Sequence, residues 1–281
     1  MMARDLTRCY VDESVYAEAG FVATSFVFGS SSLEDAVAGL LEEAGLTPRE
    51  EELKSSARMD ADPRMRAARD AVLGLARSST RIAVFVGPYD RSTIGKHCLQ
   101  ALQSVLLRNG LASTLLDVYF DEDIFASASE AKRLQPLFRG LKNLRIHPRE
   151  NSRLVLGIQV ADVVAHSFGQ IIKAEISGEA KEVEIGGLDT GYPEGTKALL
   201  SWSLLMNLRY ALLTRPMAYE GDDYALETDP VVLDPARDDP ARYGQHPILL
   251  GWGVQVAPES EAELRSAVER SLGRLWLGCI H

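Results

Sequence analysis

The sequence predicts an α/β protein with a central sheet of mixed strand direction and helices packed on it. Two strand-like runs, at residues 6–12 and 20–28, lie so close in sequence that an antiparallel hairpin is the simplest connection between them. Strand-like and helix-like segments then alternate as far as about residue 176. A hairpin that leads into such an alternation is typical of a mixed sheet.

The first helices follow this hairpin. Residues 32–45 have apolar residues at helical spacing, with Ser32 as a candidate N-cap and Gly45 as a candidate stop. The highly charged run T-P-R-E-E-E-L-K-S-S separates this helix from a second one, predicted at about 63–78.

Three more strands and three more helices complete the alternation. The clearest strand is R-I-A-V-F-V-G at 81–87, because it is apolar and Gly87-Pro88 ends it. The elements expected after it are a helix at 93–109, a strand at 113–120, a helix at 127–140, a strand at 143–148 and a long helix at 153–176.

The composition changes after about residue 177. We expect a helix at 195–213, an acid-rich segment at 218–240, a strand-like piece at 248–256 and a closing helix at about 258–275. We therefore divide the chain into one domain at 1–178 and a mainly helical or irregular appendage or subdomain of uncertain fold at 179–281.

The bulk composition excludes several classes of protein. The chain has 281 residues and a net charge of -10, so its overall field does not attract nucleic acid, and any such contact needs a local basic patch or metal ions. Three widely spaced cysteines argue against a disulfide framework or a zinc site. No apolar run approaches the roughly 18 residues that cross a bilayer. We expect a soluble, cytoplasmic protein.

Acids follow two of the predicted strands. Asp12 and Glu13 end the first strand, Asp121 and Glu122 end the strand at 113–120, and Asp162 lies in an otherwise apolar helix. A buried aspartate needs a partner, which is either an arginine or backbone amide, or a divalent cation shared with other acids. Both alternatives remain open from the residues alone.

Four short motifs resemble the domain-of-unknown-function 3800 family. They are Y-V-D-E-S at 10–14, E-L-K-S-S at 52–56, V-Y-F-D-E at 118–122 and I-Q-V-A-D-V-V-A-H at 158–166. The last motif is the most specific and departs from the family pattern only in Ile158, which replaces Leu. The first motif departs in Val15, where the family usually has Gly. The resemblance covers about residues 5–176.

This family is similar to the RNase H-like superfamily. The resemblance implies a five-stranded mixed central sheet with helices on both faces and a nuclease site of four acids that binds Mg²⁺ or Mn²⁺. Carried over by motif, the metal ligands are Asp12, Glu52, Asp121 and Asp162, with Asp117 and Asp123 as alternatives to Asp121. A two-metal site of this kind hydrolyses phosphodiester bonds.

Two further residues join the candidate catalytic set. Lys54 would contact a substrate phosphate or orient the nucleophile, with a solvated surface lysine as the alternative. His166 lies one helical turn after Asp162, on the same face, where it would shuttle a proton or assist product release, with a structural role as the alternative. Glu13 is the weaker candidate of its pair, because neighbouring residues on a strand point to opposite faces.

Basic residues gather in two segments that would contact nucleic acid. The first cluster, at 132–153, consists of Lys132, Arg133, Arg139, Lys142, Arg145, Arg149 and Arg153. The second, at 64–69, consists of Arg64, Arg66 and Arg69. A solvated face is the alternative for each cluster. A protein partner or homo-oligomer is also compatible with the sequence.

Three functions follow from these expectations. The first is a Mg²⁺- or Mn²⁺-dependent nuclease or related phosphodiesterase. The second is an RNase H-like scaffold that binds nucleic acid or protein without cleavage. The third is a small-molecule phosphohydrolase that uses the same acids.

Overall fold

The computed structural model describes residues 6–55, 61–109, 111–137, 143–186, 191–213, 248–249 and 253–272. Its strands are β1 (Arg8–Tyr16), β2 (Phe21–Gly29), β3 (Arg81–Pro88), β4 (Leu116–Asp121), β5 (Leu144–Glu150), β6 (Glu182–Glu184), β7 (Lys197–Leu199), β8 (Ile248–Leu249) and β9 (Val254–Val256). Its α-helices are α1 (Leu33–Glu43), α2 (Pro63–Ser79), α3 (Ile94–Arg108), α4 (Ala128–Leu134), α5 (Gly157–Ser177), α6 (Leu200–Leu208) and α8 (Ala262–Leu272).

Within this part of the chain, seven strands form one sheet in the order β5-β4-β1-β2-β3-β9-β8. β1 and β3 both pair antiparallel with β2, whereas β4 pairs parallel with β1 and β5 pairs parallel with β4. The predicted α/β class, the mixed sheet and the opening antiparallel hairpin are therefore confirmed.

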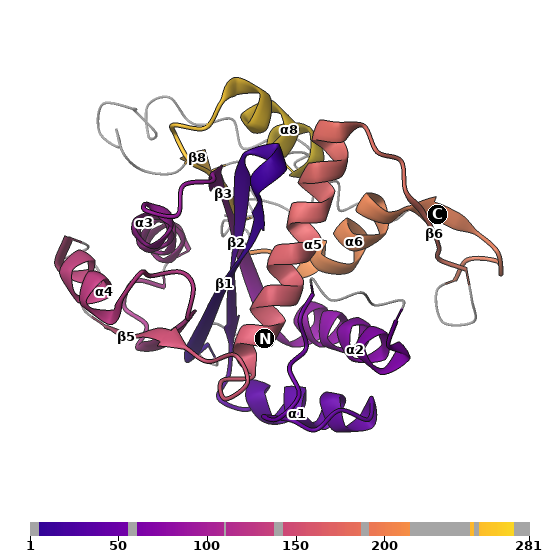
Figure 1. The fold of residues 1–281 in the computed structure, drawn as a ribbon, viewed down its shortest axis with the longest axis horizontal. Coiled ribbons are helices and arrows are strands. Elements are labelled where there is room, and N and C mark those ends of the chain that lie inside the picture. Colours follow the sequence, from indigo (N-terminus) through magenta and orange to yellow (C-terminus); the bar gives the residue numbers. More distant parts are fainter. Residues whose placement is uncertain are drawn as a thin grey trace, which may run out of the picture.

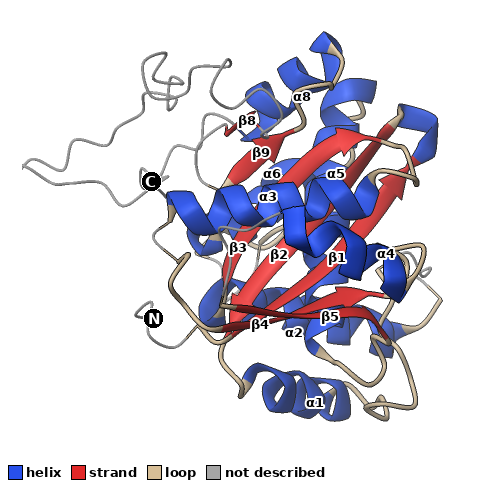
Figure 2. Ribbon diagram, turned by 90° about the vertical axis from the view of Figure 1, so that its left-hand side faces the viewer, coloured by secondary structure: helices blue, strands red, loops and turns tan. Residues whose placement is uncertain are grey.

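Helices cover both faces of the sheet (Figures 1 and 2). On one face, α5 packs on β1 and β2, and α1, α2, α6 and α8 pack against α5. The core on this face includes Tyr10, Val84 and Phe168. On the other face, α3 and α4 enclose a core that includes Val11, Phe26 and Leu102. Because neighbouring residues of β1 enter different cores, the strand presents its even-numbered side chains to α5.

Two glycines allow α5 to lie close against β1. A Cβ atom at Gly157 would fall 2.4 Å from the Tyr10 ring, and one at Gly169 would fall 2.1 Å from the Tyr16 ring. No larger residue fits at either position without movement of the Tyr10 or Tyr16 ring. This close approach sets how far the residues between these two glycines stand from the sheet.

The first strand is longer than predicted. β1 continues to Tyr16, and its pairing with β2 runs without interruption from Arg8–Gly29 to Tyr16–Phe21. A 3₁₀ turn at Ala17–Ala19 and Gly20, in the left-handed conformation with φ 71°, connect the two strands. The expectation that the strand ends at Asp12 is therefore wrong, because pairing with β2 carries the chain past the acids.

Other boundaries also differ from the sequence-based expectation. The helix expected at 153–176 begins only at Gly157, because residues 151–156 form turns around Asn151. The helix expected at 127–140 ends at Leu134 and passes into a 3₁₀ turn, Gln135–Leu137. The helix expected at 195–213 is divided into β7, α6 and a second 3₁₀ turn, Arg209–Ala211.

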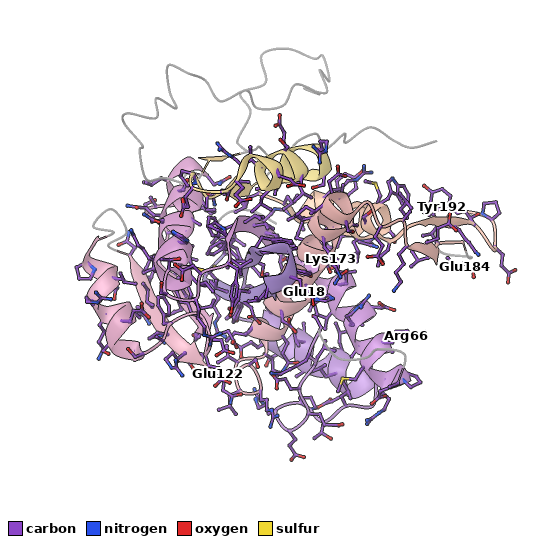
Figure 3. All side chains as sticks on the ribbon, turned by 45° about the horizontal axis from the view of Figure 1, so that its top comes forward. Glu18, Arg66, Glu122, Lys173, Glu184 and Tyr192 are labelled. Atoms are coloured by element: carbon purple, nitrogen blue, oxygen red, sulfur yellow. The ribbon has the colours of Figure 1, made fainter. Side chains whose placement is uncertain are left out.

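The described parts of 179–281 share the sheet and the core with the region before them. β9 pairs parallel with β3, and Leu212 makes an isolated bridge to Ile82. α8 packs against α5. The β6–β7 hairpin, by contrast, projects from the body, and Figure 3 shows Glu184 and Tyr192 on this projection. The division of the chain at 178 stays a prediction.

The acid-rich segment at 218–240 lies outside the described residues. Among the residues that are described, no helix is both long and apolar enough to cross a membrane.

Candidate active site

Asp12 lies inside β1, on the face that α5 covers. Its partner in the β1–β2 register is Ser25. The buried Ser25 hydroxyl donates a hydrogen bond of 2.8 Å to the carbonyl oxygen of Ala161 in α5. The residue after Ala161 is Asp162. The sheet thus holds the Asp162 turn of α5 directly over the strand pair that carries Asp12.

Asp121 reaches the same place from the neighbouring strand. β1 and β4 run parallel, and the last pair in their register is Val11 with Phe120. Asp12 and Asp121 are the next residues on the two strands. The pairing of β4 with β5 is irregular between Tyr119 and Asp121, which marks the end of regular pairing at this point. Three acids from β1, β4 and α5 therefore converge.

The electrostatics agree with this convergence. Burial, followed by the charges of Asp162, Asp121 and Glu13, raises the pKa of Asp12 well above its ordinary value. Burial also raises the pKa of Asp121 to about 6. Asp12 receives a hydrogen bond of 2.7 Å from the backbone N–H of Glu13, which offsets part of this effect. Several like charges share a poorly solvated site.

The motif I-Q-V-A-D holds the motif E-L-K-S-S. The Gln159 amide oxygen accepts a hydrogen bond of 3.1 Å from the backbone N–H of Leu53, and the Asp162 carboxylate accepts one of 2.7 Å from that of Ser55. Residues three apart lie on the same face of a helix, so Gln159 and Asp162 fix this loop together. Burial raises the pKa of Asp162, although the hydrogen bonds from Ser55 lower it in part.

This arrangement brings Glu52 to the edge of the acidic site. Glu52 is mostly buried, with 13% of its side chain exposed, and its charge contributes to the raised pKa of Asp162. Its carboxylate accepts hydrogen bonds from the Ser152 hydroxyl and from Arg153 Nε, the latter at 3.3 Å. Glu52 is therefore near the other acids, but its carboxylate is already paired with the side chain of Arg153.

Lys54 and His166 flank the acids in different environments. Lys54 Nζ lies 3.5 Å from Glu52 Oε1, and 61% of the Lys54 side chain is exposed. His166 is half-buried, stacks on Tyr16 and lies 3.4 Å from the Gln170 amide nitrogen. Burial, with the charges of Arg69 and Lys173, lowers the pKa of His166 to about 4. Its imidazole is consequently neutral near pH 7.

Glu13 points to the opposite face of the sheet, toward Arg91 and Asp123. Burial, together with the charges of Asp121 and Asp123, raises the pKa of Glu13 to about 7. Among the described residues, its buried Oε2 atom has no hydrogen-bond partner. Arg91 instead pairs with Asp123, at 2.7 Å.

The two basic clusters are partly engaged by the protein. Arg64 pairs with Asp62 and Glu51, and it donates a hydrogen bond to the carbonyl of Gly45. Arg149 donates hydrogen bonds to the carbonyls of Phe125 and Ala126. The exposed members of the first cluster that the structure describes include Lys132, Arg133 and Arg145; Arg139 and Lys142 lie outside the described residues. Figure 3 shows Arg66 of the second cluster on α2.

The acids fit a hard divalent cation in their chemistry, because all four offer carboxylate oxygens and like charges that a cation would neutralise. In the conformation that the structure describes, however, no group of three or more His, Cys, Asp or Glu side chains among the described residues is arranged to hold a metal ion. A cation held by three of these side chains would therefore require some of them to turn toward one another.

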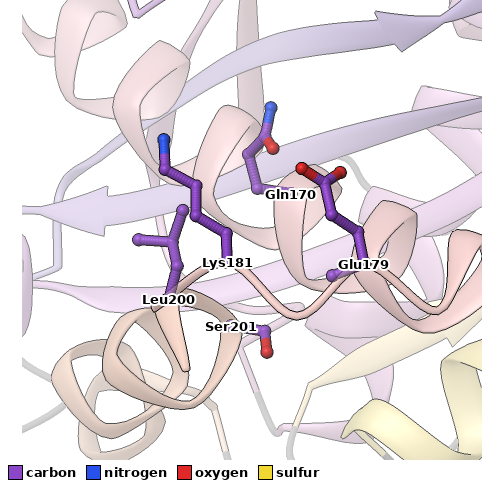
Figure 4. A pocket seen from close by; sticks show the side chains of 6 residues that line it. Gln170, Glu179, Lys181, Leu200 and Ser201 are labelled. Atoms are coloured by element: carbon purple, nitrogen blue, oxygen red, sulfur yellow. The ribbon is translucent and has the colours of Figure 1, made fainter. Parts of the chain in front are cut away.

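Two cavities lie beside the second half of α5, away from the acids. One, of about 30 Å³, is lined by residues that include Gln170, Lys181 and Ser201 (Figure 4). The other, of about 370 Å³, is lined by residues that include Ile171 and Trp202. Neither of these two cavities contains any of the predicted site residues.

Comparison of the chain with protein-family models, with curated proteins and with solved structures found no match. The resemblance to the domain-of-unknown-function 3800 family accordingly stays a prediction, and the geometry of this chain carries the functional proposal.

Sequence reasoning missed two residues that build the site. The sequence places Ser25 only within a predicted strand, since nothing in its own segment shows that it faces Ala161. Gln159 belongs to the most specific motif, and its spacing of three from Asp162 was the signal that both side chains serve one face of α5.

Proposed function

We propose that the chain is a divalent-metal-dependent phosphodiesterase, a nuclease of the RNase H-like type. The observation that carries this proposal is the convergence of Asp12, Asp121 and Asp162 from two adjacent parallel strands and the helix packed over them. The arrangement of β1 to β5, three antiparallel strands followed by two parallel additions, agrees with the five-stranded mixed sheet that the sequence resemblance implies.

Under this proposal, the site residues have separate roles in holding the metal ions, positioning the acids and contacting the substrate. Asp12, Asp121 and Asp162, with Glu52 at the edge, would hold Mg²⁺ or Mn²⁺, which when bound neutralises phosphate charge and makes a water molecule more acidic. Ser25 and Gln159 position α5 and the 52–55 loop, and thereby Asp162 and Glu52. Lys54, exposed beside Glu52, is available to a substrate phosphate. His166 is neutral near pH 7, and with a pKa of about 4 it would accept a proton only weakly.

Cleavage of end-labelled DNA and RNA, single-stranded and duplex, tests this proposal. In Mg²⁺ or Mn²⁺ we expect the wild type to cut at least one substrate and Asp12→Asn and Asp162→Asn to lose at least 100-fold of that activity. Glu122→Gln is the matched control, because Glu122 is an exposed acid next to Asp121. Equal cleavage by all four proteins would identify a contaminant and end the catalytic assignment.

A non-catalytic RNase H-like scaffold is the second candidate. It is favoured by the finding that the described acids form no ready-made group of three, and by the structural use of Asp162 to hold the Ser55 amide. Under this alternative, the protein cleaves no substrate with or without metal ions, and metal ions leave its stability unchanged. Asp162→Asn then acts only by loosening the 52–55 loop.

A further inference from the structure

A row of stacked aromatic rings crosses the sheet next to the acids. Tyr10, Tyr119 and His147 are partners in the β1–β4 and β4–β5 registers. Asp12 and Asp121 follow Tyr10 and Tyr119 by two residues on the same strands. Side chains two residues apart share one face of a strand and lie about 7 Å apart along it. The aromatic row therefore borders the acidic site on its own face of the sheet.

The rings form a continuous stack that becomes more exposed toward the sheet edge. The centroids of Tyr10 and Tyr119 are 5.5 Å apart with 18° between the ring planes, and those of Tyr119 and His147 are 4.5 Å apart with 9°. Tyr10 is fully buried, whereas 36% of the His147 side chain is exposed. β5 is one of the two edge strands of the described sheet, next to β4 (Figure 2). No described strand of this sheet therefore lies beyond His147 on the side away from Tyr119, and the His147 side chain is partly open to solvent.

Charged groups fix this stack and place a cation beside it. Asp117 Oδ1 lies 3.0 Å from His147 Nε2 and 3.5 Å from Arg145 Nη1. The guanidinium carbon of Arg8 lies 5.8 Å from the centroid of the Tyr119 ring. The Arg145 side chain is 66% exposed on the edge strand. A flat ring held in a fixed plane, with an exposed arginine two residues away, matches the chemistry of a base next to its backbone phosphate.

We propose that the outer ring face of His147 binds an unpaired nucleobase of the strand that is cleaved at the acidic site, and that Arg145 contacts the neighbouring phosphate. This inference rests on the proposed nuclease function and names single-stranded nucleic acid as its substrate. A base in this position continues the stack of Tyr10, Tyr119 and His147 by one ring. Stacking of one base on an aromatic side chain changes affinity by about 5- to 150-fold.

Binding of fluorescent oligonucleotides to the 281-residue chain in EDTA, where cleavage is absent, tests this inference. We expect His147→Ala to weaken binding of single-stranded DNA or RNA by about 5-fold or more, and His147→Phe, which keeps a ring, to bind within about 2-fold of wild type. His97→Ala is the control, because His97 is also paired with an acid, Glu259, but lies on α3. The DNA and RNA arms show which backbone is preferred.

The salt dependence separates stacking from charge. His147→Ala should leave the slope of log Kd against log salt unchanged, whereas Arg145→Ala should reduce it by about 1, since it removes one phosphate contact. In the wild type, a strand that carries 2-aminopurine should lose fluorescence on binding. This measurement needs no variant, so it stands even where His147→Ala does not fold.

Three results would overturn the inference: unchanged affinity in His147→Ala, His147→Phe as weak as His147→Ala, or an equal loss for blunt duplex, in which no base is free to stack. Failure of the nuclease proposal is distinguishable from these. If the wild type binds single strands through His147 but cleaves no substrate, only the nuclease proposal fails. If His147→Ala cleaves at the wild-type rate and binds with unchanged affinity, only the stacking site fails.

Discussion

Replacement of Asp121 by Asn should make the protein more stable and abolish its activity. The pKa of Asp121 is raised from its ordinary value of 3.8 to about 6 in the folded protein, mainly by burial. Each pKa unit corresponds to about 1.4 kcal/mol, so the charged carboxylate destabilises the fold by up to about 3 kcal/mol. Because the group is partly exposed, screening by solvent reduces this figure to about 1–2 kcal/mol.

The sign of the pH dependence follows from the same pKa. Between about pH 3.8 and pH 6, folded Asp121 keeps a proton that the unfolded chain has released, so stability falls as the pH rises through this window. The penalty is complete above pH 6. Asp121→Asn should therefore exceed the wild type by about 1–2 kcal/mol at about pH 7.5 and match it below about pH 3.8.

Urea unfolding followed by circular dichroism at these two pH values, without metal, measures the difference. Glu122→Gln is the control: Glu122 is exposed and its charge contributes least to the raised pKa of Asp121, so cleavage should stay unchanged and stability should change much less than in Asp121→Asn. An Asp121→Asn protein that is less stable than wild type at about pH 7.5 would refute the reasoning. It would show that Asp121 is held by a favourable partner and not by a strained site.

The other predictions concern the packing of α5. Gly169→Ala should lower the free energy of unfolding by about 2–3 kcal/mol in urea, because its Cβ would meet the Tyr16 ring. Ser25→Ala should lower the free energy of unfolding by about 1–2 kcal/mol and also reduce cleavage. The control is Ser167→Ala, which removes a hydrogen bond to the carbonyl four residues earlier in the same helix and should leave cleavage unchanged. Equal cleavage by the two variants would show that Ser25 does not support the site. Burial lowers the pKa of His166 to about 4, so the fold loses stability as the pH falls from about 6.5 to about 4. The free energy of unfolding of His166→Gln should lack this part of the pH dependence. Identical profiles of unfolding free energy against pH for the variant and the wild type would contradict this prediction.

The sequence predicted the class of fold because strands and helices have different hydrophobic periods. It could not predict the length of β1, since Asp12, Glu13 and Ser14 are typical of a turn and only pairing with β2 keeps them in a strand. The same limit applies to the start of α5, where turns around Asn151 delay the helix despite apolar residues before Gly157.

The candidate site shows a similar division. The motifs pointed to Asp12, Glu52, Asp121 and Asp162, and the structure brings these residues toward one region. Their support depends on contacts between distant segments, such as Ser25 with Ala161 and Gln159 with Leu53. The aromatic row was equally hidden, because Tyr10, Tyr119 and His147 become neighbours only through strand register.

Titration of the 281-residue chain with Mn²⁺, followed by electron paramagnetic resonance of the free ion, tests most directly whether these acids form a cation site. The account predicts that the wild type and Glu122→Gln remove Mn²⁺ from solution and that Asp12→Asn and Asp162→Asn do not. Binding that is absent from the wild type, or equally strong in all four proteins, would contradict it.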